Sequence, residues 1–304
     1  MRGLSRKKQK SFGVFFVICV LCGVFSQEVS VLATTRTLNV ETHTKDEIRQ
    51  YIKQHTGDGD AEMVYSTQPS TDIPYAAGVL SDATLQNALD ALNEIRYIAG
   101  IYDGVVLDSN YTARCQAGTL VNAVNGILEH EPAKPADMEQ SLYELGYEGT
   151  SSSNIAMGYS DFISVVRHGW MADEDAYNID RLGHRRWCLN PEMGKTGFGY
   201  TSGYSAMYSF DTSYSVTEDK TVVWPAQNMP TDFFEGSYPW SVSSDVAFAD
   251  DVKVVLTQLD GDADASNDKV WEFSSVSADG YFNYSEGGYG QRHCLIFRPD
   301  DIPM

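Results

Sequence analysis

Three histidines stand at positions from which their side chains could do chemistry. His130 follows a helical segment in "GILEHEP", His168 lies within one in "SVVRHGWM", and His184 opens "GHRRWCLNP" between a predicted helix and a predicted strand. Neutral imidazole is the commonest metal ligand in proteins, and histidine changes its charge near neutral pH. Histidines at the ends of elements can meet in a cleft, so His130 and His184 are the candidates. We expect His168 to pack or to face solvent.

Spacing alone does not define a site for this pair. His130 and His184 are 54 residues apart, and no local H-E-x-x-H motif links them. Any shared site must therefore come from the way the fold brings their elements together.

The sequence pattern predicts that the elements that position these histidines are helices followed by short strands. Apolar residues recur at helical spacing from 81 to 99, and Gly100 is placed to end that helix. Asp108 is a candidate cap for a second helix that reaches about residue 125. Further helices are predicted over 45–54, 137–145 (ended by Gly146) and 161–171, and strands over 196–200 and 206–210.

After about residue 212 no helical period remains. Short strands separated by Gly, Asp and Ser turns are predicted over 222–224, 252–259, 269–273, 281–284 and 294–297. The acidic segment 260–264 invites a calcium-loop interpretation, but Ala265 and Trp271 occupy positions where an EF-hand needs Gly and Glu. A solvated hairpin loop is the better prediction for it.

The first 33 residues have the three parts of a removable secretory signal. Five Lys or Arg residues precede an uncharged apolar run over 12–25, and Ala33 offers a small residue for cleavage. The run is shorter than the ~20 residues that a membrane-spanning helix needs. We expect a secreted, extracellular protein without a transmembrane span after signal cleavage.

The charge and the cysteine content of the chain limit its partners and the kind of scaffold that it can form. The chain of 304 residues has a formal net charge of −20, which repels nucleic acid and anionic membrane. Cys115, Cys188 and Cys294 follow the signal, too few for a disulfide-built scaffold. The three cysteines could form one disulfide bridge, such as Cys115–Cys188, or all three could be buried and reduced.

Several motifs together resemble the bacterial branch of the CAP superfamily, which comprises the cysteine-rich secretory, antigen-five and pathogenesis-related proteins. The motifs run in order from "ALNEIRYIAGIYDGVVLD" through "HEP", "SSNIAMG", "VVRHGWMAD" and "GHRRWCLNP" to "TGFGY", across roughly residues 81–212. The strongest is "GHRRWCLNP…GFG", against the bacterial pattern G-H-R-x-N-I-L-N-P…G-x-G. The resemblance also covers a β-rich extension behind such domains.

The resemblance implies an α+β fold, a three-layer α-β-α sandwich followed by a small all-β domain. Its domain division would be a signal peptide at 1–33, a polar lead-in at 34–76, a CAP domain at 77–212 and a β-rich accessory domain at 213–304.

In the family, a central cleft holds two histidines and two acidic residues. The histidines map onto His130 and His184, and one acid maps onto Asp173, with Glu174 beside it. The other acid position holds Ser153, so the tetrad is incomplete. His130, His184 and Asp173 are thus a candidate three-ligand site for Zn²⁺ or another divalent cation, bound weakly.

Neighbouring residues have plainer expected roles. Asn154 is expected to tie down a loop through hydrogen bonds to the backbone. Arg185 is expected to pair with the surrounding acid, and Trp170 and Trp187 to pack in the core.

The resemblance implies a non-enzymatic binding module, because relatives bind lipids, sterols or proteins in the cleft and neighbouring grooves. The partner would then be an extracellular lipid, peptide or cell-surface component. The alternative is a metal-dependent extracellular hydrolase acting on peptide or cell-wall material. Two further interpretations remain open: a polar cluster that only holds the cleft together, and docking through the β-rich unit alone.

Overall fold

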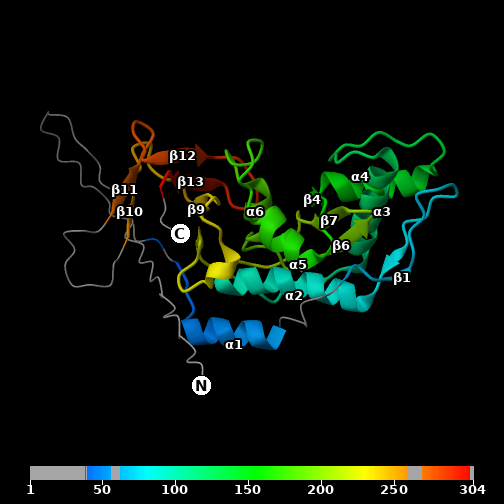
Figure 1. Ribbon diagram of the computed structural model, residues 1–304, viewed down its shortest axis with the longest axis horizontal. Helices are drawn as coiled ribbons and strands as arrows, with labels where there is room; N and C mark the ends of the chain where they lie inside the picture. The colour runs from blue at the N-terminus through cyan, green and yellow to red at the C-terminus, as the bar shows by residue number, and fades with distance from the viewer. Residues whose placement is uncertain (1–37, 39, 56–61, 259–268, 302–304) are drawn as a thin grey trace, which may run out of the picture.

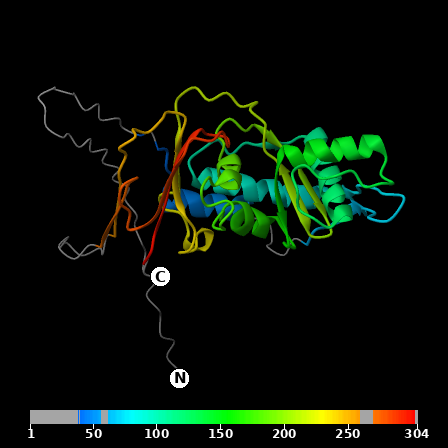
Figure 2. The ribbon, with the colours of Figure 1, turned by 90° about the horizontal axis from the view of Figure 1, so that it is seen from above.

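The computed structural model describes residues 38, 40–55, 62–258 and 269–301 (Figures 1 and 2). The predicted signal segment and the acidic segment 260–264 lie outside these residues. The fold combines helices and strands in one α+β chain. Figure 1 places the C-terminal strands at the left, helices α3 and α4 at the right, and α6 between them.

A three-stranded antiparallel sheet lies at the centre of the helical part, in the order β4 (Ser153–Met157), β7 (Tyr204–Tyr208), β6 (Phe198–Thr201). Side chains alternate between its two faces. Phe198 and Met207 share a core with helix α2 (Asp82–Ile98), α5 (Phe162–Ser164) and the π-helix η1 (Val165–Trp170). Ile155 and Ala206 pack on the opposite face against Cys115.

Helix α3 (Ser109–Asn125) covers that second face, and α4 (Gln140–Ser151) packs on α3. Glycine makes both contacts close. A Cβ on Gly199 of β6 would lie 2.3 Å from the carbonyl carbon of Cys115, and one on Gly149 would lie 2.0 Å from the Arg114 oxygen. The "GFG" segment therefore has a packing role: it lets the α3 backbone approach the sheet.

The segment before the first core helix joins the fold. Helix α1 (Lys45–His55) packs on α2 and buries Ile48, while β1 (Tyr65–Thr67) pairs with β2 (Val79–Leu80). A short parallel pair, β3 (Val106–Leu107) with β5 (Lys195–Thr196), flanks the start of α3. The polar lead-in is thus partly structured.

The C-terminal strands form a four-stranded antiparallel sheet in the order β12 (Gly280–Ser285), β13 (His293–Pro299), β9 (Trp240–Ser244), β8 (Thr221–Trp224). Beside it, β10 (Val254–Thr257) pairs with β11 (Val270–Phe273). Trp224 and Phe233, the latter in the 3₁₀-helix η2 (Thr231–Phe233), belong to the same buried cluster as α2. The β-rich segment therefore shares a core with the helical part, so residues 213–304 are not a free-standing module.

Two sequence predictions of secondary structure are wrong in detail. The helix predicted over 137–145 begins at Gln140 and runs through Gly146 to Ser151. A Cβ on Gly146 would lie 2.7 Å from the Val121 side chain, so this glycine serves helix contact rather than helix termination. The segment that opens with His184 is a short helix, α6 (Gly183–Cys188), rather than a connection between elements.

The predicted helix over 161–171 has nearly the right bounds, but its second half is π-helical. Strands β4 and β9 had no clear signal in the sequence. Within the described residues, no helix combines the length and apolar composition that crossing a membrane requires.

Candidate functional site

The site is built on the loop that joins η1 to α6. Two residues in this loop have left-handed backbone conformations without being glycine, Asp173 (φ 46°) and Leu182 (φ 49°). Asp tolerates this region, whereas a branched apolar residue such as Leu does so at a cost. Such strain persists only where the surroundings over-determine it, and it concentrates at functional sites.

Asp173 holds His184 through its carboxylate. The Nδ1 atom of His184 lies 2.7 Å from Oδ1 of Asp173, and the backbone N–H of Arg185 donates to Oδ2 at 3.0 Å. Asp173 is buried, whereas the side chain of His184 is 21% exposed. Because a carboxylate accepts, Nδ1 carries the proton and Nε2 keeps the lone pair when the ring is neutral.

This arrangement sets the charge preference of His184. Burial lowers the pKa of its imidazole, but the negative charge and hydrogen bond of Asp173, with Asp175 beyond it, outweigh burial and raise the pKa above its usual value. A histidine oriented by a carboxylate is suited to proton transfer or to binding a metal through Nε2.

Asn154 and Ser153 face opposite sides of strand β4. Asn154 donates from Nδ2 to the backbone oxygen of His184 at 2.9 Å and lies 3.4 Å from the Cys188 sulfur. Ser153 turns the other way, where its Oγ lies 3.4 Å from Cys115 Sγ against α3. Asn154 therefore bonds to the backbone as expected, but to helix α6 rather than to a loop, and Ser153 does not join the His184 side of the sheet.

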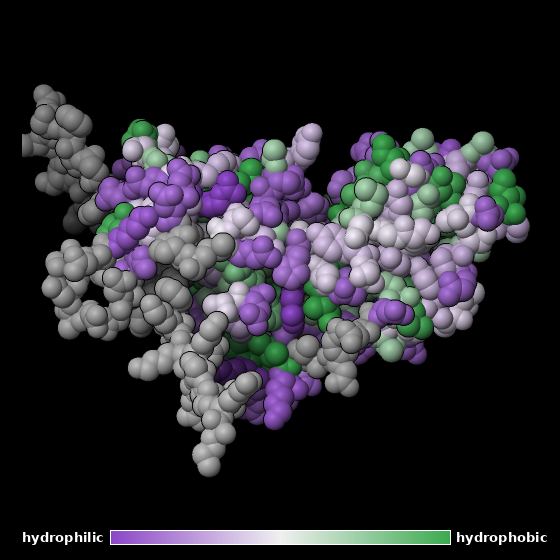
Figure 3. Space-filling model, in the orientation of Figure 1, coloured by the Kyte–Doolittle hydropathy of each residue, from purple (hydrophilic) through white to green (hydrophobic). Residues whose placement is uncertain are grey.

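His130 is exposed and bonds to the end of α4. Its Nδ1 lies 2.8 Å from the Thr150 carbonyl oxygen. A carbonyl only accepts, so Nδ1 donates and Nε2 is again left with its lone pair. Figure 3 shows an indentation in the upper outline of the molecule, with α6 on one side and α4 on the other.

The three candidate metal ligands are not gathered into one group. Within the described residues, no three His, Cys, Asp or Glu side chains lie together in a way that could hold a metal ion. Both Asp173 oxygens are engaged by His184 and Arg185, and Glu174 is exposed to solvent. Asp173 is therefore placed behind His184 as an orienting group.

The side chain of Arg185 holds the loop between η1 and α6 in place. Its guanidinium donates to the backbone oxygens of Met171 (2.7 Å), Ala172 (2.9 Å) and Pro239. The expectation that this side chain pairs with an acid is wrong, since only its backbone N–H reaches Asp173. Complete burial lowers the pKa of Arg185 to about 10, despite the nearby charge of Asp173.

Trp187, which was expected to pack in the core, instead pairs with Phe210 on the side of α6 that carries His184. Trp187 lies one helical turn after His184, and its ring is 4.8 Å from that of Phe210. Trp187 is half-buried and Phe210 is 49% exposed, whereas Trp170 is buried as expected. The signal was present in "GHRRWCLNP", where Trp187 replaces the Asn of the bacterial pattern.

His168 lies on η1, outside the loop and the helix that hold His184, whereas Cys188 on α6 contacts Asn154. His168 is 43% exposed and its Nδ1 lies 3.1 Å from the Tyr238 hydroxyl. Cys115, Cys188 and Cys294 are all free and buried. Burial raises the pKa of Cys115 to about 12 and also raises those of Cys188 and Cys294, so these thiols stay protonated near neutral pH.

No family model, curated protein or solved structure matches this chain.

Proposed function

We propose that this chain is a secreted CAP-type protein that acts as a non-enzymatic binding module. The motifs between residues 81 and 212 motivate the family, and the arrangement of helices on both faces of β4–β7–β6 is compatible with a three-layer sandwich. The ligand would be an extracellular lipid, peptide or cell-surface component that enters beside α6.

One observation carries the proposal: a partly open imidazole and an aromatic pair sit on the same side of α6. His184 presents Nε2, and Trp187 with Phe210 adds apolar surface one turn away. Aromatic side chains of this kind contribute large contact area at low cost in entropy.

We also propose that the protein binds a divalent metal ion, because of the tautomers of His130 and His184. Both His130 and His184 donate through Nδ1, which leaves each Nε2 free to bind a divalent cation such as Zn²⁺. Asp173 would act behind His184, as carboxylates behind metal-binding histidines do. Few protein ligands imply modest affinity that falls as pH drops, because protons compete for the imidazoles.

A zinc-dependent thermal shift tests whether the protein binds a metal ion through these histidines. We expect zinc to raise the Tm of the mature protein, and His130→Ala and His184→Ala each to reduce that rise. His168→Ala is the matched control, because it removes an imidazole outside the cluster. Metal binding by His130 and His184 is contradicted if zinc does not raise the Tm of the wild type. It is also contradicted if zinc raises the Tm equally in the wild type and all three variants.

The second candidate is a metal-dependent hydrolase acting on peptide or cell-wall material. The His184–Asp173 pair favours it, because a carboxylate-oriented imidazole is suited to general-base chemistry. Incubation with peptide libraries and peptidoglycan, with and without chelator, separates the two. A chelator-sensitive product that His184→Ala loses would favour the hydrolase over the binding module.

A further inference from the structure

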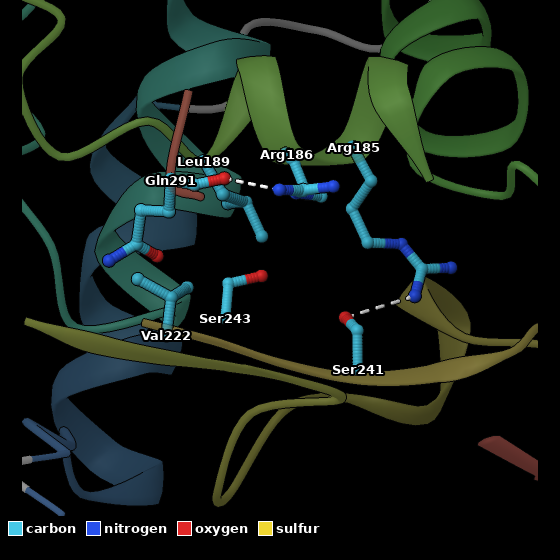
Figure 4. Close-up of a pocket in the computed structure, with 7 residues that line it drawn as sticks. All are labelled: Arg185, Arg186, Leu189, Val222, Ser241, Ser243 and Gln291. Atoms are coloured by element: carbon cyan, nitrogen blue, oxygen red, sulfur yellow. Dashed lines mark hydrogen bonds between the residues drawn. The ribbon is translucent and has the colours of Figure 1, made fainter. Parts of the chain in front are cut away.

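A small cavity lies between α6 and the C-terminal sheet. Figure 4 shows Arg185 extending from α6 to Ser241 on β9, whereas the guanidinium of Arg186 bonds to the backbone oxygen of Gln291. The cavity has room for about one water-sized particle or a small ion. Its complete lining is Arg185, Arg186, Leu189, Val222, Ser241, Ser243 and Gln291.

Arg186 brings a positive charge to this cavity without a carboxylate to balance it. The residue is 2% exposed, and its guanidinium donates to the backbone oxygens of Arg181, Gly287, Gln291 and Arg292 and to the Ser285 hydroxyl. Every one of these acceptors is neutral. Burying a cation without an opposite charge is costly, and burial lowers the pKa of Arg186.

Arg185 adds a second buried cation in the same place. It is 1% exposed, and its guanidinium also bonds only to neutral oxygens: three backbone carbonyls and the Ser241 hydroxyl. Within the described residues, neither guanidinium forms an ion pair with a carboxylate. The buried carboxylate of Asp173 lies close enough to act on the charge of Arg185, whereas no described carboxylate acts on Arg186 in this way.

Donors at the cavity remain unused. The Nε of Arg186 is buried and has no hydrogen-bond partner. Ser241 Oγ accepts from Arg185 Nη1 at 3.3 Å, so its own proton is free to donate. An unsatisfied buried donor costs more than a typical hydrogen bond contributes, which favours an occupant that accepts.

We infer that this cavity binds a small monovalent anion, with chloride the probe of choice. A water molecule also accepts from such donors, but only an anion adds the negative charge that Arg186 lacks. The size of the cavity excludes sulfate and phosphate. Its role is structural: the anion holds α6 to β8 and β9, independently of the function proposed for the His184 site.

Two measurements test the inference on the full mature chain. Crystals grown in bromide should show an anomalous peak within hydrogen-bond distance of Arg186 and Ser241. At fixed ionic strength, replacing gluconate with chloride should raise Tm by about 2–4 °C. Holding ionic strength constant removes the general screening that any salt exerts on an acidic protein.

Ser243→Val fills the cavity and should abolish the chloride-specific rise, whereas Ser275→Val, at an exposed turn, should keep it. A water molecule in place of bromide, or a cavity variant that responds to chloride like the wild type, overturns the inference. If Ser243→Val does not fold, the bromide experiment on the wild type still decides.

Discussion

His184 donates from Nδ1 to Oδ1 of Asp173 across 2.7 Å, and this bond determines which ring nitrogen faces a ligand. The other Asp173 oxygen accepts the N–H of Arg185, the next residue on α6. One buried carboxylate therefore fixes both the tautomer of the imidazole and the first turn of the helix that carries it.

Asp173→Asn should lower the pKa of His184. The substitution removes the negative charge that outweighs burial, while it keeps a side-chain oxygen that can accept from Nδ1. Titration of the ring protons by NMR measures this pKa directly. Glu174→Gln, which removes a charge from the exposed neighbour, is the control, and an equal decrease in both variants contradicts the assigned role of Asp173.

The same pair makes stability depend on pH. The pKa of His184 is raised in the folded state, so its pairing stabilises the protein fully below the unfolded value of 6.5 and loses this contribution as pH rises through the folded pKa. The free energy of unfolding lost in His184→Gln should therefore be larger at pH 5 than at pH 9. Urea unfolding at both values checks it, and an equal loss would contradict the raised pKa.

Helices were predictable where a single residue type fixes an end. Asp108 caps α3 as predicted, and α2 begins where the helical spacing of apolar residues begins, with Ser81 accepting from the Thr84 N–H. The glycine in α4 misled the prediction, because its reason for being there is contact with Val121 of another helix. A local pattern cannot separate a glycine that ends a helix from one that lets two helices meet.

The candidate site was only partly predictable. Motif resemblance selected Asp173 and His184, which the structure brings into direct contact. It did not reveal that Ser153 turns away toward Cys115, since that depends on the strand that contains it and on its register. The carbonyl partners of Arg185 are Met171, Ala172 and Pro239, the last of which precedes β9 and is more than 50 residues away, so nothing local encodes them.

Gly199→Ala should strongly destabilise the protein. The added Cβ would lie 2.3 Å from the carbonyl carbon of Cys115, so α3 must move off the sheet. Overpacking of this kind costs about 1–3 kcal/mol of unfolding free energy. Gly288→Ala is the matched control, since its Cβ meets nothing within 4 Å. Thermal melting compares the two, and equal Tm values would contradict the close helix–sheet contact.

Asp211→Asn should destabilise the loop that follows β7. The Asp211 carboxylate accepts from the N–H groups of Gly194, Lys195 and Ser213 and from the hydroxyls of Ser213 and Tyr111. Burial raises its pKa, but these hydrogen bonds outweigh burial and lower it. We expect a loss of about 1–3 kcal/mol near neutral pH.

That loss should shrink in acid. A lowered folded pKa means that Asp211 stabilises the protein above its unfolded value, and this contribution disappears as pH falls through the folded pKa. Chemical unfolding at pH 7 and pH 3 measures it, with the exposed Asp232→Asn as control. A loss that is the same at both pH values would mean that the ionised carboxylate is not what holds the loop.

Arg185→Lys should change both the stability of the protein and the pKa of His184, because Arg185 connects the C-terminal sheet to the loop that holds this histidine. Lysine keeps the charge but lacks the planar fork, so it cannot serve the oxygens of Met171, Ala172 and Pro239 together. Each buried carbonyl left without a donor costs about 1–3 kcal/mol. Because the Met171–Asp173 turn loosens, the pKa of His184 should also move toward its ordinary value.

Arg298→Lys is the matched control for this substitution, since Arg298 donates a single bond, to the Ser237 oxygen at 3.0 Å. NMR titration of His184 together with urea unfolding gives both readouts for the two variants. If Arg185→Lys lowers stability but leaves the His184 titration unchanged, the guanidinium only binds the two halves of the core together. A simultaneous change in both makes Arg185 the residue through which strand β9 positions the imidazole.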